Sequence, residues 1–125
     1  MQVRDKIKVC KDGKCIEVIA LFDTGADISV ISEKVAEKLG FNKYKEPISI
    51  GSAYKGKEGQ EVGDLVAELE IGGCRMNRRS ILYVVRDLEE DVIIGMNIIE
   101  HFKVRLDLER GKAYFETCPP VVKIV

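Results

Sequence analysis

An aspartate follows directly after an apolar run in this chain. A carboxylate at such a position needs hydrogen-bond or charge partners. Ile19 to Phe22 is a short β-branched and aromatic run typical of a buried strand, and Asp23 ends it. A carboxylate beside apolar packing is costly unless it is hydrogen-bonded or shares its charge. Thr24 and Gly25 follow, and they supply a hydroxyl that can fix a turn and a residue that lets another backbone or a ligand come close. A carboxylate held in this way is a candidate for acid and base chemistry.

The plain alternative is an ordinary turn, because Asp, Thr and Gly are all common turn residues. The surrounding sequence favours a site. Residues 26–31 alternate between apolar and other side chains, so we expect a second strand to leave the aspartate. Residues 92–95 form another apolar run that ends in glycine, and a helical pattern follows from Met96 to His101. The aspartate is therefore expected on a loop between strands.

These segments together resemble a known family. The order Asp-Thr-Gly-Ala-Asp, followed by an Ile-Ile-Gly strand with a helix behind it, is similar to the retropepsin-like aspartic proteases, in their retroviral and small cellular single-domain forms. The resemblance implies an all-β fold, namely a retropepsin-like closed β-barrel with one or two short helices and a flap hairpin, active as a homodimer. It implies an aspartic endopeptidase in which Asp23, Thr24 and Gly25 are catalytic. The residues that it implies for substrate binding are Ala26, Asp27, Ile28, Ile50, Gly51, Ser52, Ala53 and Ile93.

The implied mechanism needs two aspartates that share one proton, so that one activates water and the other protonates the scissile carbonyl. The chain has a single Asp-Thr-Gly, and none of its other aspartates combines an apolar approach with a glycine exit. A two-fold homodimer with Asp23 of each chain at the axis would supply the second carboxylate. The alternative is a dimeric module that keeps the fold but only binds peptides or proteins.

The sequence departs from the family at two positions near this site. Met96 stands where retroviral members carry an arginine that pairs with the acid matching Asp27, so Asp27 is expected to find another partner or to face substrate. Ile28 replaces an acid found in one viral branch. Together with Ile93, it predicts a cleft that favours apolar peptide side chains.

Length and composition limit the other possibilities. A chain of 125 residues with 46% hydrophobic residues predicts one domain over residues 1–125. Lysine and arginine number 20 against 21 acids, so no overall basic field argues for nucleic acid or a membrane surface, and a peptide or protein partner is expected. The first residues are charged from Arg4 onward and lack an apolar core, which predicts a cytoplasmic protein. Neither a cofactor nor a metal is expected, because no zinc, nucleotide or phosphate signature is present.

Asp12-Gly13 gives the strongest hairpin signal in the chain, because this dipeptide suits a two-residue type I′ turn. The turn sets Cys10 opposite Cys15 in a non-hydrogen-bonded pair, where a disulfide is geometrically possible. In a reducing cytosol a reduced pair is favoured, and a bridge is favoured if the source is a hyperthermophile. The spacing of Cys74 and Cys118 predicts nothing about their pairing.

A second, longer hairpin is expected in the middle of the chain. Pro47 precedes a predicted strand from Ile48 to Tyr54, and Val62 to Ile71 alternates as its partner. The glycine-rich stretch between them predicts a mobile flap with its tip within Gly51 to Lys57, as a protease needs to cover a bound peptide.

The remaining segments have simpler patterns. Ser32 is placed to cap a short helix through Leu39. Phe102–Leu108 and Ala113–Thr117 predict another hairpin. Four of the five residues in Val121–Val125 are β-branched and apolar, so this tail needs an existing sheet edge or another subunit, and the resemblance implies the other subunit.

Overall fold

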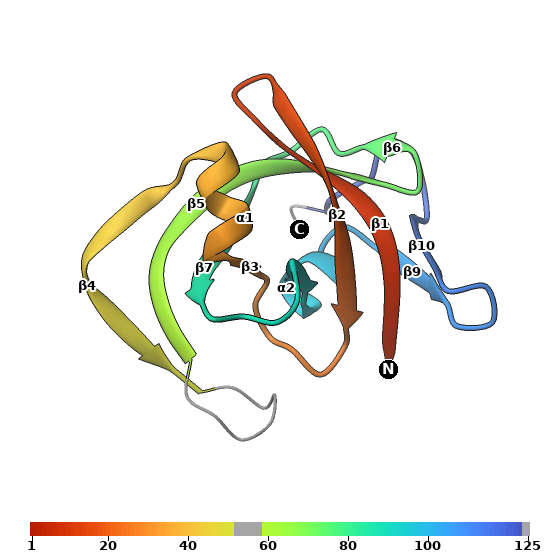
Figure 1. Cartoon of the computed structure of the whole chain (residues 1–125). Helices are drawn as coiled ribbons and strands as arrows, with labels where there is room; N and C mark the ends of the chain where they lie inside the picture. The colour runs from red at the N-terminus through yellow and green to blue at the C-terminus, as the bar shows by residue number, and fades with distance from the viewer. Residues whose placement is uncertain (52–58, 124–125) are drawn as a thin grey trace.

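The computed structural model describes residues 1–51 and 59–123, which form strands and two short helices (Figure 1). No helix in these residues is long and apolar enough to span a membrane. The helices are α1 (Glu33–Leu39) and α2 (Met96–Ile99). The strands are β1 (Gln2–Lys11), β2 (Lys14–Asp23), β3 (Val30–Ser32), β4 (Asn42–Ile50), β5 (Gly59–Ile71), β6 (Cys74–Arg75), β7 (Ser80–Arg86), β8 (Val92–Ile94), β9 (Val104–Asp107) and β10 (Lys112–Phe115).

Six of the strands close into a barrel. They hydrogen bond in the order β1, β2, β8, β3, β7 and β5, and a short pairing of β5 with β1 completes the ring. Closure gives each of these strands a partner on both sides over at least part of its length, and β4 extends the sheet outward from β5 (Figure 1). The expected all-β closed barrel with short helices is confirmed.

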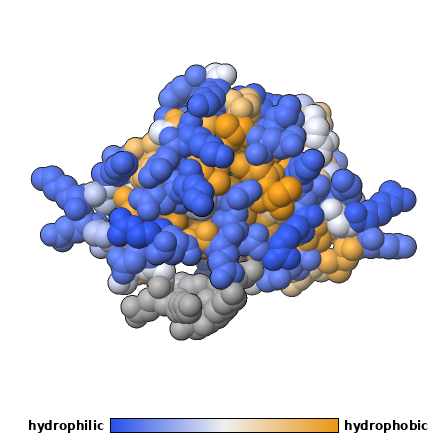
Figure 2. All heavy atoms as spheres, viewed as in Figure 1, coloured by the Kyte–Doolittle hydropathy of each residue, from blue (hydrophilic) through white to orange (hydrophobic). Residues whose placement is uncertain are grey.

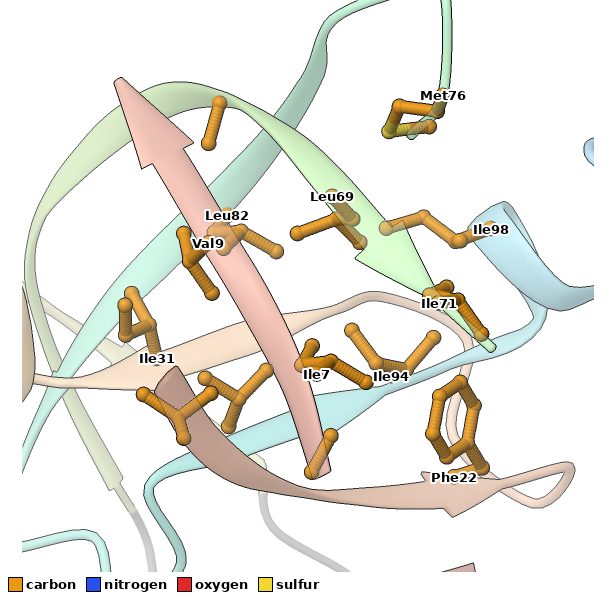
Figure 3. Close-up of a cluster of buried hydrophobic side chains, with 14 of the residues drawn as sticks. Ile7, Val9, Phe22, Ile31, Leu69, Ile71, Met76, Leu82, Ile94 and Ile98 are labelled. Atoms are coloured by element: carbon orange, nitrogen blue, oxygen red, sulfur yellow. The ribbon is translucent and has the colours of Figure 1, made fainter. Parts of the chain in front are cut away.

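The barrel interior is filled with apolar side chains that point toward one another (Figure 3). Strand β5 shows why, because successive side chains of a strand point to opposite faces. One set lies inside the barrel, while Val66, on the other face, remains exposed. Seen along the direction of Figure 1, apolar residues gather near the middle of the surface and hydrophilic residues surround them (Figure 2). The core side chains labelled in Figure 3 are Ile7, Val9, Phe22, Ile31, Leu69, Ile71, Met76, Leu82, Ile94 and Ile98.

The β1–β2 hairpin has the predicted turn and register. Asp12 and Gly13 have φ angles of 50° and 80°, as a type I′ turn requires, and Cys10 lies opposite Cys15. The two cysteines form a disulfide, so the preference for a reduced pair was wrong. The hairpin register places the two cysteines directly opposite each other with both side chains on one face of the sheet, and this arrangement permits the disulfide.

The β4–β5 hairpin differs from its predicted form. Strand β4 begins at Asn42 rather than at Ile48, and its pairing with β5 is interrupted between Lys43 and Ile48. Pro47 lies in that interruption, where its missing N–H breaks no ladder hydrogen bond. The predicted flap tip falls mostly on residues 52–58, which lie outside the described residues.

The predicted helix and the last predicted hairpin are both present. The Ser32 hydroxyl accepts a hydrogen bond from the Val35 N–H at 3.2 Å and caps α1. Strands β9 and β10 pair as the predicted hairpin, except that β10 begins one residue early at Lys112 and ends at Phe115. A disulfide from Cys118 to Cys74 fixes the segment that follows β10. The expected terminal strand is absent from its described part, residues 121–123, where Val122 packs against the barrel core.

Candidate active site

Asp23 is the last residue of β2, and a hydrogen bond donor lies at each of its carboxylate oxygens. The Gly25 N–H donates to Oδ1 at 2.8 Å, and the Gln2 side-chain amide donates to Oδ2 at 3.2 Å. Leu21 and Phe22 before it are fully buried, whereas Asp23 itself is partly exposed. The strand therefore holds a carboxylate with fixed orientation at the border between the core and solvent.

The start of the chain is part of this site, which sequence reasoning missed. The Met1 carbonyl oxygen accepts hydrogen bonds from the Thr24 N–H at 3.1 Å and from the Thr24 hydroxyl at 3.4 Å. Gln2 lies opposite Asp23 in the β1–β2 register. That pairing follows from counting outward from the Asp12-Gly13 turn, so the signal was available in the sequence.

The loop after Asp23 rests on the beginning of α2. The N–H of Met96 donates to the Ala26 carbonyl at 2.7 Å, and the N–H of Asn97 donates to the Asp27 carbonyl at 3.2 Å. These are two of the N–H groups that have no partner inside a helix. Gly95 lies so close to the loop that a Cβ there would be 2.7 Å from the Ala26 carbonyl oxygen. The loop geometry thus depends on a glycine and a helix far along the chain.

Ser29 links the same two segments through its side chain, and this role was also missed. The fully buried Ser29 hydroxyl donates to Asn97 Oδ1 at 2.7 Å and accepts from the Gly95 N–H at 2.9 Å. A buried hydroxyl with two partners is satisfied and rigid. No local sequence signal marks this contact, because 68 positions separate Ser29 from Asn97.

The structure brings several of the predicted substrate-binding residues together. Ala26, Ile50 and Ile93 belong to one small apolar cluster beside the barrel core. Asp27, Ile28 and Gly51 are exposed, and the predicted residues Ser52 and Ala53 lie outside the described residues. Within the part of the chain that the structure describes, the Asp27 side chain has no hydrogen bond or ion pair. The other residues of this apolar cluster are Leu21, Val30, Tyr83, Val85 and Leu88.

Tyr44 joins the two strands of the β4–β5 hairpin close to the break in their pairing. Its hydroxyl lies 2.8 Å from Glu61 Oε2 and 2.9 Å from Asp64 Oδ2. Burial, together with these two carboxylates, raises the pKa of Tyr44 well above its usual range. The phenol therefore remains a neutral hydrogen bond donor to the hairpin.

Comparison with known proteins agrees with this geometry. A family model described as aspartyl protease matches residues 7–98. DNA damage-inducible protein 1 of Phaeosphaeria nodorum is 26% identical over 103 residues, which are 82% of this chain and 23% of that protein. The chain thus spans less than a quarter of that relative's length.

Two solved structures have the same fold. The retroviral protease-like domain of Ddi1 from Leishmania major superposes with a TM-score of 0.69 at 17% identity, covering 98% of this chain and 94% of that one. The EIAV protease in complex with the inhibitor HBY-793 gives a TM-score of 0.61 at 20% identity, covering 86% and 94%. The retropepsin-like fold expected from the Asp-Thr-Gly segment is confirmed.

Proposed function

Because the chain belongs to the aspartyl protease family, we propose that it is an aspartic endopeptidase that works as a homodimer. The observation that carries this proposal is the placement of the Asp23 carboxylate. Its carboxylate is held in a fixed orientation at the exposed end of a buried strand, and no second carboxylate among the described residues contacts it. Water activation by a shared-proton pair needs a second acid, which a two-fold related copy would supply.

In the proposed dimer, the two Asp23 side chains share one proton. The ionised carboxylate removes a proton from the attacking water, while the protonated one donates its proton to the scissile carbonyl oxygen. The Gly25 N–H holds Oδ1 in place, so Oδ2 is the oxygen that exchanges protons with water. The Gln2 amide, which lies 3.2 Å from Oδ2, must share this oxygen with the water or move away from it.

The surroundings of Asp23 support a peptide substrate with apolar side chains. The small cluster that contains Ala26, Ile50 and Ile93 offers an apolar wall, and Ile28 is 39% exposed beside it. Asp27 is exposed and would face the peptide. Gly51, with Ser52 and Ala53 after it, is assigned to the flap that covers the substrate and excludes water.

The Gln2 contact favours a second candidate function. An amide that already occupies Oδ2 of Asp23 competes with the catalytic water for that oxygen. A dimer in which Gln2 stays in place would bind peptides in the same cleft without cleaving them. Only hydrolysis distinguishes the two functions.

Digestion of a peptide library tests the proposal. Wild type is expected to cleave peptides, and Asp23→Asn is expected to lose roughly a thousandfold or more in kcat. Asp12→Asn is a matched control, because Asn-Gly suits the same type I′ turn far from the site. A wild-type dimer that binds peptides but cleaves none would leave the binding module as the function.

Mixing subunits tests whether the two acids come from two chains. Wild type and Asp23→Asn are combined in equal amounts and allowed to exchange fully, well above the dimer dissociation constant. If each site needs Asp23 from both chains, only wild-type homodimers work and activity is about a quarter of that of the same total wild-type protein. Activity of about half after verified exchange would mean that each chain carries a complete site.

The cytoplasmic location stays a prediction. Two disulfides bridge Cys10 to Cys15 and Cys74 to Cys118. Structural disulfides are rare in the reducing cytosol of mesophiles but common inside hyperthermophiles. The two disulfides therefore fit a cytoplasmic location if the protein comes from a hyperthermophile.

A further inference from the structure

A hollow of about 680 Å³ lies between the segment that leads into β7 and the end of α2. Its described lining contains none of the residues assigned to catalysis or predicted to bind substrate, although Asn97 and Tyr83 connect it to the loop and the apolar cluster beside Asp23. A second hollow of about 460 Å³ shares two of its lining residues, Asn97 and His101, so the two hollows are neighbours across α2. Basic residues line both, with Arg78 and Arg79 in the larger and Lys103 and Lys123 in the smaller.

Arg78 and Arg79 differ from every other arginine in the chain. Both are exposed, and neither forms an ion pair or hydrogen bond with a described residue. Among the described residues, Glu68 is the one acid that lines the larger hollow, and Arg75 already pairs with it at 3.0 Å. The arginines that do have carboxylate partners are Arg4, Arg75, Arg86, Arg105 and Arg110.

We propose that this hollow is a docking site for an acidic peptide segment of a partner protein. Arg78 and Arg79 are neighbours in the chain, line the same hollow and have no partner among the described residues, and their guanidinium groups offer forked donors that match carboxylates. Ile81 is 44% exposed and gives the wall apolar surface, whereas Phe102, which also lines the hollow, is only 3% exposed. An acidic segment with interspersed apolar residues fits both features, whereas free inorganic anions would leave the apolar wall uncovered.

A peptide fits this surface better than a nucleic acid does. The chain carries a net charge of −1, so no broad positive field attracts a phosphate backbone. Glu68 and Glu100 lie in the linings of the two hollows and would repel phosphates that run past the arginines. A nucleic-acid strand carries a phosphate at every nucleotide, whereas the charges of an acidic peptide can alternate with apolar side chains, so fewer negative charges meet these acids.

The test measures binding by fluorescence anisotropy, in Asp23→Asn protein so that no probe is cleaved. The probe is a labelled twelve-residue peptide of alternating glutamate and leucine. The double variant Arg78→Glu with Arg79→Glu is expected to weaken binding roughly tenfold or more. Lys34→Glu is the matched control, because this exposed lysine on α1 also has no described ion-pair partner and is expected to leave binding unchanged.

Two further measurements identify the chemistry. Replacing glutamate by glutamine in the probe is expected to abolish binding, and the Arg78→Lys with Arg79→Lys protein is expected to bind with an intermediate affinity. Equal loss with Lys34→Glu, or unchanged binding in the double charge reversal, would overturn the proposal. Tighter binding of a single-stranded oligothymidine than of the acidic peptide would overturn it in favour of a nucleic acid. Because no readout depends on hydrolysis, these outcomes are independent of the proposed protease activity.

Discussion

The two long hairpins of this molecule are built in opposite ways. The β1–β2 hairpin pairs without interruption from Gln2 opposite Asp23 to Lys11 opposite Lys14. The β4–β5 hairpin loses its register between Lys43 and Ile48. A carboxylate that must be held in one orientation lies at the end of the continuous hairpin. The interrupted hairpin leads to Gly51, which we propose as the first residue of a flap, and a flap has to open for substrate to enter.

The two hairpins also differ in burial, because β2 of the continuous one is packed into the core and β4 of the interrupted one is mostly exposed. Strand β2 buries Val18, Ala20, Leu21 and Phe22, whereas β4 has no fully buried residue. Displacing β2 would expose core side chains, but displacing β4 exposes little apolar surface. Core packing therefore gives the region near Asp23 its stiffness, and we expect equal substitutions in the two hairpins to have unequal effects.

The largest difference is expected between two glycine substitutions. In Gly95→Ala the new methyl group would overlap the Ile28 carbonyl and lie 2.7 Å from the Ala26 carbonyl, in a loop that cannot move away. In Gly63→Ala it would overlap the Asn42 carbonyl and meet the Phe41 ring, so β4 would have to shift, and the mostly exposed side chains of β4 lose little packing when it does. Urea denaturation is expected to show a loss of at least about 3 kcal/mol for Gly95→Ala and about 1 kcal/mol for Gly63→Ala. Equal losses would contradict the contrast between the hairpins.

A smaller effect is expected from removing a serine hydroxyl. Ser29→Ala leaves the Gly95 N–H and Asn97 Oδ1 without their buried partner, which is expected to cost about 2 to 3 kcal/mol in the free energy of unfolding. Ser49→Ala, on exposed β4, is the control and is expected to cost less than about 0.5 kcal/mol. A loss for Ser29→Ala as small as that of the control would show that the loop is not held by this hydroxyl.

Removing the Cys10–Cys15 disulfide tests whether core packing or the covalent bridge holds the β1–β2 hairpin. The bridge closes a short loop, with a sequence separation of 5, so the Cys10→Ala, Cys15→Ala variant is expected to lose about 2 kcal/mol of stability. Peptide cleavage at 25 °C is expected to persist, because the packed strand and not the bridge positions Asp23. Loss of activity in a protein that is still folded by circular dichroism would mean that the bridge holds the hairpin.

The smallest effect is expected at Tyr44, in the interrupted hairpin. Tyr44→Phe removes a hydroxyl that touches Glu61 and Asp64, at an expected cost of about 1 kcal/mol near pH 8. Because folding raises the pKa of Tyr44, the contribution is fully present below about pH 10, where the unfolded phenol is also protonated, and decreases as the pH rises further. The difference between wild type and Tyr44→Phe should therefore shrink at about pH 11. The exposed Tyr114→Phe serves as the control, and a difference that grew above pH 10 would reverse the sign of this argument.

Local signals predicted the parts of the fold whose causes are local. The Asp12-Gly13 turn and the Ser32 cap depend on residues within a few positions, and both were predicted correctly. The start of β4 at Asn42 was missed, because its side chains are mostly exposed and show no apolar alternation.

Predictions for the candidate site divide in the same way. The loop position expected for Asp23 was wrong, because Asp23 still pairs with Gln2 as the last residue of β2, and the turn begins only after it. The Ser29 contact with Asn97 depends on the folding of distant segments onto each other, and no single-sequence pattern carries that information. Ala26 and Ile93 were assigned by family resemblance alone, and the structure places them in one apolar cluster.

The disulfide between Cys74 and Cys118 has a mechanical consequence. It turns 44 positions of chain into a covalent ring that contains β7, β8, α2, β9 and β10. A pulling force applied to the two ends of the protein passes through the sulfur bridge and never along the polypeptide inside the ring. The fully stretched molecule would therefore be shorter by about 150 Å than its reduced form, at about 3.5 Å per residue. In the oxidised protein, β8 and α2, which support the Asp23 loop, would lose their neighbours under load but would not themselves be drawn out.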